Sequence, residues 1–258
     1  MTAWPFWGEK KFANVYENIY IRSSVEDWFN LVAEVAREID SVSANPKHIL
    51  DVGCGEGHTT KQVLDRVTGE YVCDLLEPDA DALASAVTFL KQENTIGESF
   101  AEPLSTFTTE KKYDVIFTSH TNYYWSDEQV GYDAQLEKLT AMLAEGGKLI
   151  ILTLPEQSGH YRIMLHQVYP TFNYAEYITD FYRNTGHKTE VKEVQMRLFI
   201  GDLLTTTSKY DVGIFYRFIH NTDSFPTANE AAKFLGKIKE IQHGGYVDFK
   251  DHLITVSR

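Results

Sequence analysis

The sequence has few cysteines, a deficit of basic residues and no long apolar run. Only two cysteines occur in 258 residues, Cys54 and Cys73, and no Cys/His spacing suggests metal ligands. Both fall in stretches expected to be buried, so we expect reduced thiols, no disulfide and no metal site. No apolar run has the length of a membrane span, and the N-terminus lacks the continuous apolar segment of a signal peptide. These absences favour a cytoplasmic protein with no membrane partner.

The charge balance is acidic. There are 24 Lys and Arg against 37 Asp and Glu, a formal net charge of −13. Such a chain repels phosphate backbones, so we expect no nucleic-acid partner and a small-molecule substrate that can be cationic. The composition leaves the oligomeric state open. With 43% hydrophobic residues, the chain has the composition of one large globular α/β domain rather than two.

A glycine-rich loop follows the first predicted strand. Residues 48–52 form a largely apolar run, and the glycines of 53–57 lead into a helical stretch over 58–67. Glycine lets the backbone take positive φ values and lets a ligand lie against peptide groups near a helix start. A dinucleotide fingerprint would need glycine at position 58, where the sequence has His58. We therefore predict contacts to another nucleoside cofactor from Asp51, Gly53, Gly55 and Gly57.

An acidic residue ends the second predicted strand. Residues 71–76 form a buried-strand pattern, and Glu77 follows at its carboxyl end. A carboxylate there can accept hydrogen bonds from both ribose hydroxyls of a nucleoside that crosses the sheet. Asp79 is better placed to begin the next helix. We therefore predict that Glu77 binds the ribose.

Two further strand ends supply candidate residues. A weak strand over 96–101 should end beside the adenine, although a plain loop fits as well, and a clear strand over 113–119 runs into a polar and aromatic segment at 120–125. Ligands of doubly wound sheets bind outside the carboxyl ends of the strands, so we expect cofactor and substrate to meet at this segment. The cofactor candidates are Phe100, Ala101 and Ser119, and the catalytic candidates are His120, Tyr123 and Tyr124.

The rest of the chain continues the alternation of strands and helices, which implies a parallel, doubly wound sheet with right-handed crossovers. We expect one domain over 1–258, in which 1–45 form an N-terminal cover and first helix, and 155–186 and 201–244 are cap insertions. The other predicted elements are helices over 127–143, 202–219 and 227–241, and strands over 148–154, 188–199 and 246–257.

Together these motifs resemble the class I S-adenosylmethionine (SAM) methyltransferases, and most closely the histamine N-methyltransferase family. The resemblance covers nearly the whole chain. It implies a Rossmann-like α/β fold, a doubly wound, mostly parallel sheet of seven strands whose last strand is inserted antiparallel, with SAM as cofactor and a helical, aromatic cap. It rests on the glycine loop and on Leu-Glu-Pro-Asp-Ala at 76–80, His-Thr-Asn-Tyr-Tyr at 120–124, Gly-Asp-Leu-Leu at 201–204 and Asp-Phe-Lys-Asp-His at 248–252.

The resemblance also implies substrate-binding residues. In that family a glutamate on the first helix, a glutamine before the Tyr-Tyr pair and an asparagine on the last strand hold the amine. By position these fall on Glu26, His120 and Asp251, of which only Glu26 keeps the family's residue type. A carboxylate in the first turn of a helix can also simply stabilise the helix dipole, which is the alternative for Glu26.

We therefore predict a methyltransferase that acts on an amine or imidazole nitrogen. His120 would accept the acceptor's proton, directly or through water, and no covalent enzyme intermediate is needed. The alternative for His120 is a structural histidine bound by the backbone. The rival functions are a phenol or carboxylate O-methyltransferase that uses His120 as base, a nucleotide-dependent oxidoreductase and a non-catalytic SAM-binding subunit.

Overall fold

The computed structural model describes residues 25–126, 128–159, 171–205, 212–213, 215–217 and 224–258. Residues 1–24 of the N-terminal cover and first helix expected over 1–45 lie outside the described residues, as do 160–170 and most of 206–223 within the expected cap. None of the helices in the described ranges combines the length and apolar character of a membrane span.

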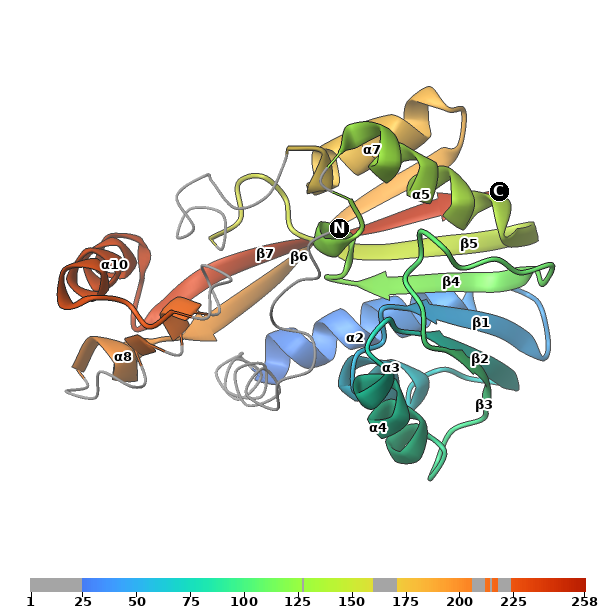
Figure 1. Cartoon of the computed structure of the whole chain (residues 1–258), viewed down its shortest axis with the longest axis horizontal. Helices are drawn as coiled ribbons and strands as arrows, with labels where there is room; N and C mark the ends of the chain where they lie inside the picture. The colour runs from blue at the N-terminus through green and yellow to red at the C-terminus, as the bar shows by residue number, and fades with distance from the viewer. Residues whose placement is uncertain (1–24, 127, 160–170, 206–211, 214, 218–223) are drawn as a thin grey trace. The chain divides into compact units, whose positions relative to one another are not determined.

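A seven-stranded sheet in the order β3-β2-β1-β4-β5-β7-β6 forms the fold (Figure 1). Strands β1 to β5 pair in parallel, whereas β7 runs antiparallel to β5. This order confirms the expected doubly wound, mostly parallel sheet with its last strand inserted antiparallel. The strands are β1 (Lys47–Val52), β2 (Tyr71–Leu76), β3 (Ile96–Phe100), β4 (Tyr113–Ser119), β5 (Leu143–Thr153), β6 (Lys188–Phe199) and β7 (Tyr246–Ser257).

Helices connect the strands, and their starts follow local sequence rules. Asp79 caps the helix after β2 by accepting hydrogen bonds from the backbone N–H groups of Asp81 and Ala82, as its position in the sequence indicates. Thr227 and Glu230 form a reciprocal capping box on a late helix. The helices are α2 (Val25–Asp40), α3 (His58–Leu64), α4 (Ala80–Leu90), η1 (Asn122–Tyr124), α5 (Gln129–Ala141), η2 (Thr171–Asn173), α7 (Ala175–Asn184), α8 (Gly201–Thr205) and α10 (Ala228–Ile241).

Strand β5 begins earlier than the sequence indicates. We expected the strand over 148–154, entered through two glycines, but β5 includes both glycines and starts at Leu143. The β4–β5 register shifts between Tyr113 and Val115, so the extra residues form an irregularity in the ladder. A Cβ on Gly147 would lie 3.0 Å from the carbonyl oxygen of Tyr113, which explains a glycine at this close approach. The helix expected over 58–67 is also shorter, since α3 ends at Leu64.

The chain separates into two compact units. The sheet unit comprises Asn30–Pro155, Pro170–Val194 and His252–Arg258, and the second unit comprises Met1–Phe29, Glu156–Tyr169 and Gln195–Asp251. In the sheet unit the central strands β1, β4 and β5 supply fully buried side chains to one core; they include Leu50, Ile116, Leu149 and Ile151. The expectation of a single domain over the whole chain stays a prediction.

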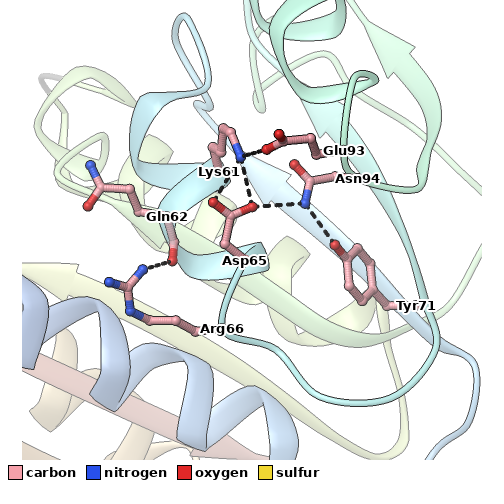
Figure 2. Close-up of polar contacts among 7 residues, drawn as sticks. All are labelled: Lys61, Gln62, Asp65, Arg66, Tyr71, Glu93 and Asn94. Atoms are coloured by element: carbon pink, nitrogen blue, oxygen red, sulfur yellow. Dashed lines mark hydrogen bonds and ion pairs between the residues drawn. The ribbon is translucent and has the colours of Figure 1, made fainter.

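A polar network holds the α3 side of the sheet unit together (Figure 2). The ammonium group of Lys61 lies 2.8 Å from the Asp65 carboxylate and also pairs with Glu93. The amide of Asn94 donates to Asp65 at 3.3 Å and to the hydroxyl of Tyr71 at 3.0 Å. Since Tyr71 begins β2, this network lies at the amino end of that strand, away from the carboxyl end where we expect the cofactor.

Candidate active site

The three glycines of the loop after β1 all have positive φ, but their surroundings differ. Gly53 has φ +77°, and a Cβ there would lie 2.4 Å from Cγ2 of Thr121. Gly57, with φ +84°, precedes α3, and a Cβ there would lie 3.1 Å from Cδ1 of Leu90. Gly55 also has positive φ, +54°, but among the described residues nothing lies within 4 Å of its added Cβ. Gly53 and Gly57 thus permit close packing, whereas Gly55 leaves open space for a ligand.

Glu77 is joined directly to this glycine loop. Its side chain is 1% exposed, and one carboxylate oxygen accepts the N–H of Gly55 at 3.0 Å while the other accepts the N–H of Asp79 at 3.0 Å. Burial raises the pKa of Glu77, and the two backbone hydrogen bonds oppose that rise. A carboxylate has about four lone-pair sites, so each oxygen can accept one more donor. The arrangement therefore suits a carboxylate that receives the two hydroxyls of a ribose.

Asp51 connects the end of β1 to α3. Its carboxylate is 2% exposed and accepts a hydrogen bond from the hydroxyl of Thr60 at 2.6 Å. Burial raises the pKa of Asp51 to about 7; the Thr60 hydrogen bond opposes this, and the nearby charge of Glu77 adds to it. The acid therefore titrates close to neutral pH. Its predicted contact with the cofactor stays a prediction.

The segment expected over 96–101 as a weak strand or a loop is the strand β3, and its end lies beside Glu77. Phe100 is the partner of Leu76 in the β2–β3 ladder, and its carbonyl oxygen accepts the N–H of Glu77 at 3.1 Å. The ring of Phe100 packs against Phe107 with centroids 4.9 Å apart, and Ala101 is exposed. Both candidates are thus at the expected edge, and their contact with an adenine stays a prediction.

Ser119 ends β4 with a buried hydroxyl oxygen that has no hydrogen-bond partner in the structure as described. Buried polar atoms are almost always paired, so such an oxygen is typical of a place that a ligand or water completes. The open space over Gly55, the remaining lone pairs of Glu77 and this hydroxyl all belong to the sheet unit. The residues present therefore fit a polar nucleoside cofactor at the carboxyl ends of β1, β2 and β4.

His120 follows Ser119 in a strained backbone conformation. It is the non-glycine residue with positive φ, +54°, in the described part of the chain. Its N–H donates to the carbonyl oxygen of Leu152 at 2.9 Å, which fixes it to the end of β5. Non-glycine residues with positive φ cost free energy and are concentrated at functional sites. The half-buried imidazole is thus held at the strand edge where the sequence places the reaction.

Tyr123 links His120 to β5. The phenol is 4% exposed, and its oxygen accepts the N–H of Leu154 at 2.6 Å and the hydroxyl of Thr153 at 3.0 Å. Nδ1 of His120 lies 3.4 Å from the same oxygen. The ring of Tyr124 meets that of Tyr123 edge-on, with centroids 6.3 Å apart. The structure therefore brings all three catalytic candidates together.

Residues that the sequence analysis missed hold this segment in place. The side-chain amide of Asn122 donates to the carbonyl oxygen of Asn173 at 2.6 Å, and the amide of Asn173 donates to the carbonyl oxygen of Tyr123 at 3.4 Å. Thr121, the residue before η1, donates to the carbonyl oxygen of Val52 on β1 at 3.2 Å. Thr153 is recognisable in the sequence as a polar residue inside an apolar strand, but nothing in the sequence identifies Tyr123 as its partner.

Glu26 and Asp251 belong to the second unit. Glu26 is exposed in the first turn of α2, whereas its neighbour Asp27 is buried and receives two hydrogen bonds from Arg197, at 2.7 and 2.9 Å. Asp251 lies on β7 and is 4% exposed. Their role in substrate binding therefore stays a prediction from the resemblance.

No group of three or more His, Cys, Asp or Glu side chains within the described ranges is arranged to hold a metal ion. Both cysteines are buried, and burial raises the pKa of each thiol above its usual value. The chemistry of the described site therefore comes from carboxylates, hydroxyls, backbone N–H groups and one imidazole.

Comparison with known proteins agrees with this geometry. A family model described as a methyltransferase domain matches residues 23–197. Malonyl-[acyl-carrier protein] O-methyltransferase 1 of Ilyobacter polytropus is 26% identical over 156 residues, which cover 60% of this chain and 54% of that protein. The match thus spans about half the length of that relative.

Two of the solved structures that match this chain illustrate the shared fold. The N-methyltransferase NodS of Bradyrhizobium japonicum, in complex with S-adenosylhomocysteine, has a TM-score of 0.54 at 13% identity, over 97% of this chain and 99% of its own. The magnesium protoporphyrin IX methyltransferase of Synechocystis, with bound SAM, has a TM-score of 0.57 at 11% identity, over 99% and 95%. At these identities the likeness concerns the fold.

Proposed function

Because this chain belongs to the class I SAM-dependent methyltransferases, we propose that it transfers a methyl group from SAM to a small molecule, with an amine or imidazole nitrogen as the acceptor atom. The observation that carries the cofactor assignment is the hydrogen bond between the Gly55 backbone and the Glu77 carboxylate. The carboxylate accepts the Gly55 N–H at 3.0 Å, and no atom of the described residues lies within 4 Å of the position that a Cβ on Gly55 would take. A ligand can therefore lie against the loop and reach the acid at the same time.

The cofactor residues have separate tasks in this proposal. Glu77 would accept hydrogen bonds from the ribose, and Gly55 would let the backbone approach the ligand. Ser119 would pair its buried hydroxyl with the amino-acid part of the ligand, and the end of β3 at Phe100 and Ala101 would lie along the adenine. When bound, SAM supplies a methyl group whose bond to a positive sulfur breaks with both electrons staying on sulfur, while the acceptor's lone pair forms the new bond.

The main task of the protein is then to align acceptor and donor in a site that excludes water. Orientation alone corresponds to effective molarities of about 10⁵ to 10⁸ M. His120, Tyr123 and Tyr124 lie at the carboxyl end of β4, where an acceptor would approach. Because His120 is fixed by its backbone bond to Leu152, it offers the acceptor a rigid polar contact.

The nitrogen assignment is supported by charge and by the resemblance. A net charge of −13 favours a cationic acceptor, and Glu26 and Asp251 correspond by position to residues that hold an amine. A protonated nitrogen has no lone pair, so a carboxylate that pairs with the reacting nitrogen would oppose the transfer. We therefore propose that Glu26 binds a second nitrogen, as in a heterocycle that bears an ethylamine group.

Oxygen is the second candidate acceptor atom. It is favoured by the curated relative from Ilyobacter polytropus, which is named an O-methyltransferase of malonyl-[acyl-carrier protein]. A carboxylate or phenolate carries its own lone pairs and needs no base once it is ionised. The net charge of −13 opposes a carboxylate acceptor more than a neutral phenol.

One screen tests the proposal. The protein is incubated with methyl-deuterated SAM and separate pools of amines, imidazoles, phenols and carboxylic acids, including malonyl-acyl carrier protein, and mass spectrometry detects the labelled methyl group in the product. We expect label in the amine or imidazole pool. Label only in the phenol or acid pool would overturn the nitrogen assignment, and the Gly55→Val variant serves as a control whose cofactor space is filled.

A further inference from the structure

The oxygen of Tyr123 has both of its lone pairs in use. It accepts the backbone N–H of Leu154 at 2.6 Å and the hydroxyl of Thr153 at 3.0 Å. A phenol oxygen accepts two hydrogen bonds and donates one. In its contact with Nδ1 of His120, at 3.4 Å, Tyr123 must therefore be the donor and the imidazole nitrogen the acceptor.

We propose that Tyr123 is a positioning residue that holds neutral His120 with its proton on Nε2, so that His120 offers a hydrogen-bond donor to the methyl acceptor. The two imidazole nitrogens carry one proton between them when the ring is neutral, and an Nδ1 that accepts leaves that proton on Nε2. Only the identity of the group that receives this hydrogen bond rests on the proposed function.

The surroundings of Tyr123 keep this arrangement rigid. Tyr123 is 4% exposed, and its backbone carbonyl oxygen accepts a hydrogen bond from the side-chain amide of Asn173 at 3.4 Å. The rings of His120 and Tyr123 stack, with centroids 6.3 Å apart and an interplanar angle of 29°. The backbone N–H of His120 binds Leu152 on the same strand that supplies Thr153. The backbone of His120, directly, and its ring, through Tyr123, are thus both held by contacts to the end of β5.

This tautomer changes the role of His120 in methyl transfer. The sequence predicts a base at His120 without naming the ring nitrogen. A base at Nε2 needs the opposite tautomer, with the proton on Nδ1. A donor at Nε2 instead orients an acceptor that already has its lone pair. A hydrogen bond to the reacting lone pair would compete with attack on the methyl group, so His120 donates to a different lone pair of the acceptor molecule. Such a lone pair is present on the second oxygen of a reacting carboxylate, or on a carbonyl oxygen near a reacting amine.

Nuclear magnetic resonance tests the tautomer without any substrate. A long-range proton–nitrogen spectrum is recorded on the whole protein with nitrogen-15-labelled histidine, at about pH 8, where an ordinary imidazole is neutral. The His120 signals are assigned by their loss in His120→Asn. We expect an unprotonated Nδ1 and a protonated Nε2. A protonated Nδ1 would overturn the proposal, whereas failure to find any methyl acceptor would leave this spectrum unchanged.

Two variants show whether Tyr123 is the cause. In Tyr123→Phe we expect a mixture of tautomers, kcat/KM for the acceptor lower by about 3- to 10-fold, the worth of one neutral hydrogen bond, and unchanged SAM affinity. Thr153→Val leaves the phenol oxygen a lone pair with which to accept from Nδ1, so it should also mix the tautomers and serves if Tyr123→Phe does not fold. If both variants keep the proton wholly on Nε2, the proposal is wrong.

A matched control removes a similar hydroxyl elsewhere. Tyr71→Phe deletes a phenol oxygen that accepts the amide of Asn94 at 3.0 Å, at the amino end of β2 (Figure 2). It should leave the His120 spectrum and kcat/KM as they are in the parent. Equal changes in Tyr71→Phe and Tyr123→Phe would mean a general loss of structure and would contradict a positioning role.

Discussion

The glycine loop after β1 and the segment after β4 lie at the carboxyl ends of neighbouring strands, yet they are built in opposite ways. Backbone shapes the loop, because positive φ at residues 53, 55 and 57 and a carboxylate that binds a backbone N–H define it. Side chains shape the segment at 119–125, because the phenol of Tyr123, two asparagine amides and the hydroxyls of Thr121 and Thr153 tie it to β1, β5 and η2.

The difference separates the cofactor from the acceptor. A site made of backbone and one acid can serve any chain that binds the same nucleoside, whereas a site made of side-chain contacts can differ from chain to chain. Changes in the loop should therefore affect SAM binding and stability, and changes in the segment should affect turnover. The predictions below run from the largest expected effect to the smallest.

The largest effect should come from the buried acid at the loop. The pKa of Asp51 is raised to about 7, so the folded chain binds its proton more tightly than the unfolded chain does. The contribution of Asp51 to the free energy of unfolding is present in full below about pH 4 and is lost as the pH rises through about 7. Its upper bound is about 4 kcal/mol. Asp51→Asn should remove this slope from urea unfolding measured across that range. Asp81→Asn, at an exposed acid on α4, is the control, and a slope that persists in Asp51→Asn would contradict the assignment.

Two substitutions within the loop should differ in stability. Gly53→Ala adds a Cβ 2.4 Å from Cγ2 of Thr121 at positive φ, so we expect a loss of about 3 kcal/mol in the free energy of unfolding. Gly55→Ala meets no described atom within 4 Å and should lose about 1 kcal/mol from its backbone alone. Denaturant titration of both variants measures the difference, and equal losses would show that Thr121 moves aside.

His120 should affect turnover and leave SAM binding unchanged. If Nε2 donates to the acceptor, His120→Ala should lower kcat/KM by about 10-fold, the worth of one hydrogen bond. His120→Asn should lose less, because asparagine tolerates positive φ and presents an amide donor. A loss in His120→Ala of about 10² to 10⁴ would indicate general-base catalysis instead and contradict the donor role.

The smallest effect should come from Glu26, which is exposed on α2. If it holds a second nitrogen of the acceptor, Glu26→Gln should raise KM by a few-fold, about 1 kcal/mol or less, with little change in kcat. Steady-state kinetics measures this split. A variant that lowers only the melting temperature would identify Glu26 as a residue that stabilises the helix.

The sequence alone predicts most of the sheet and the cofactor loop. Strands β4, β6 and β7 begin and end at the predicted residues, and Glu77 lies buried beside the glycine loop. These features depend on local patterns, namely apolar runs, glycines and an acid at a strand end. The contact of Thr121 with Gly53 and the bonds from Tyr123 to β5 join segments far apart in the chain, so no local pattern reveals them. The early start of β5 depends on the β4 register in the same way.

The pairing of Gly55 with Glu77 is the central claim for the cofactor, and calorimetric titration with SAM tests it most directly. In Glu77→Gln one acceptor oxygen becomes an amide donor, which cannot accept from a ribose hydroxyl or from a backbone N–H. We expect one binding site per chain in the parent, affinity about 10- to 100-fold weaker in Glu77→Gln, and no change in Glu98→Gln, at an exposed acid on β3. Unchanged SAM affinity in a folded Glu77→Gln variant would contradict the account.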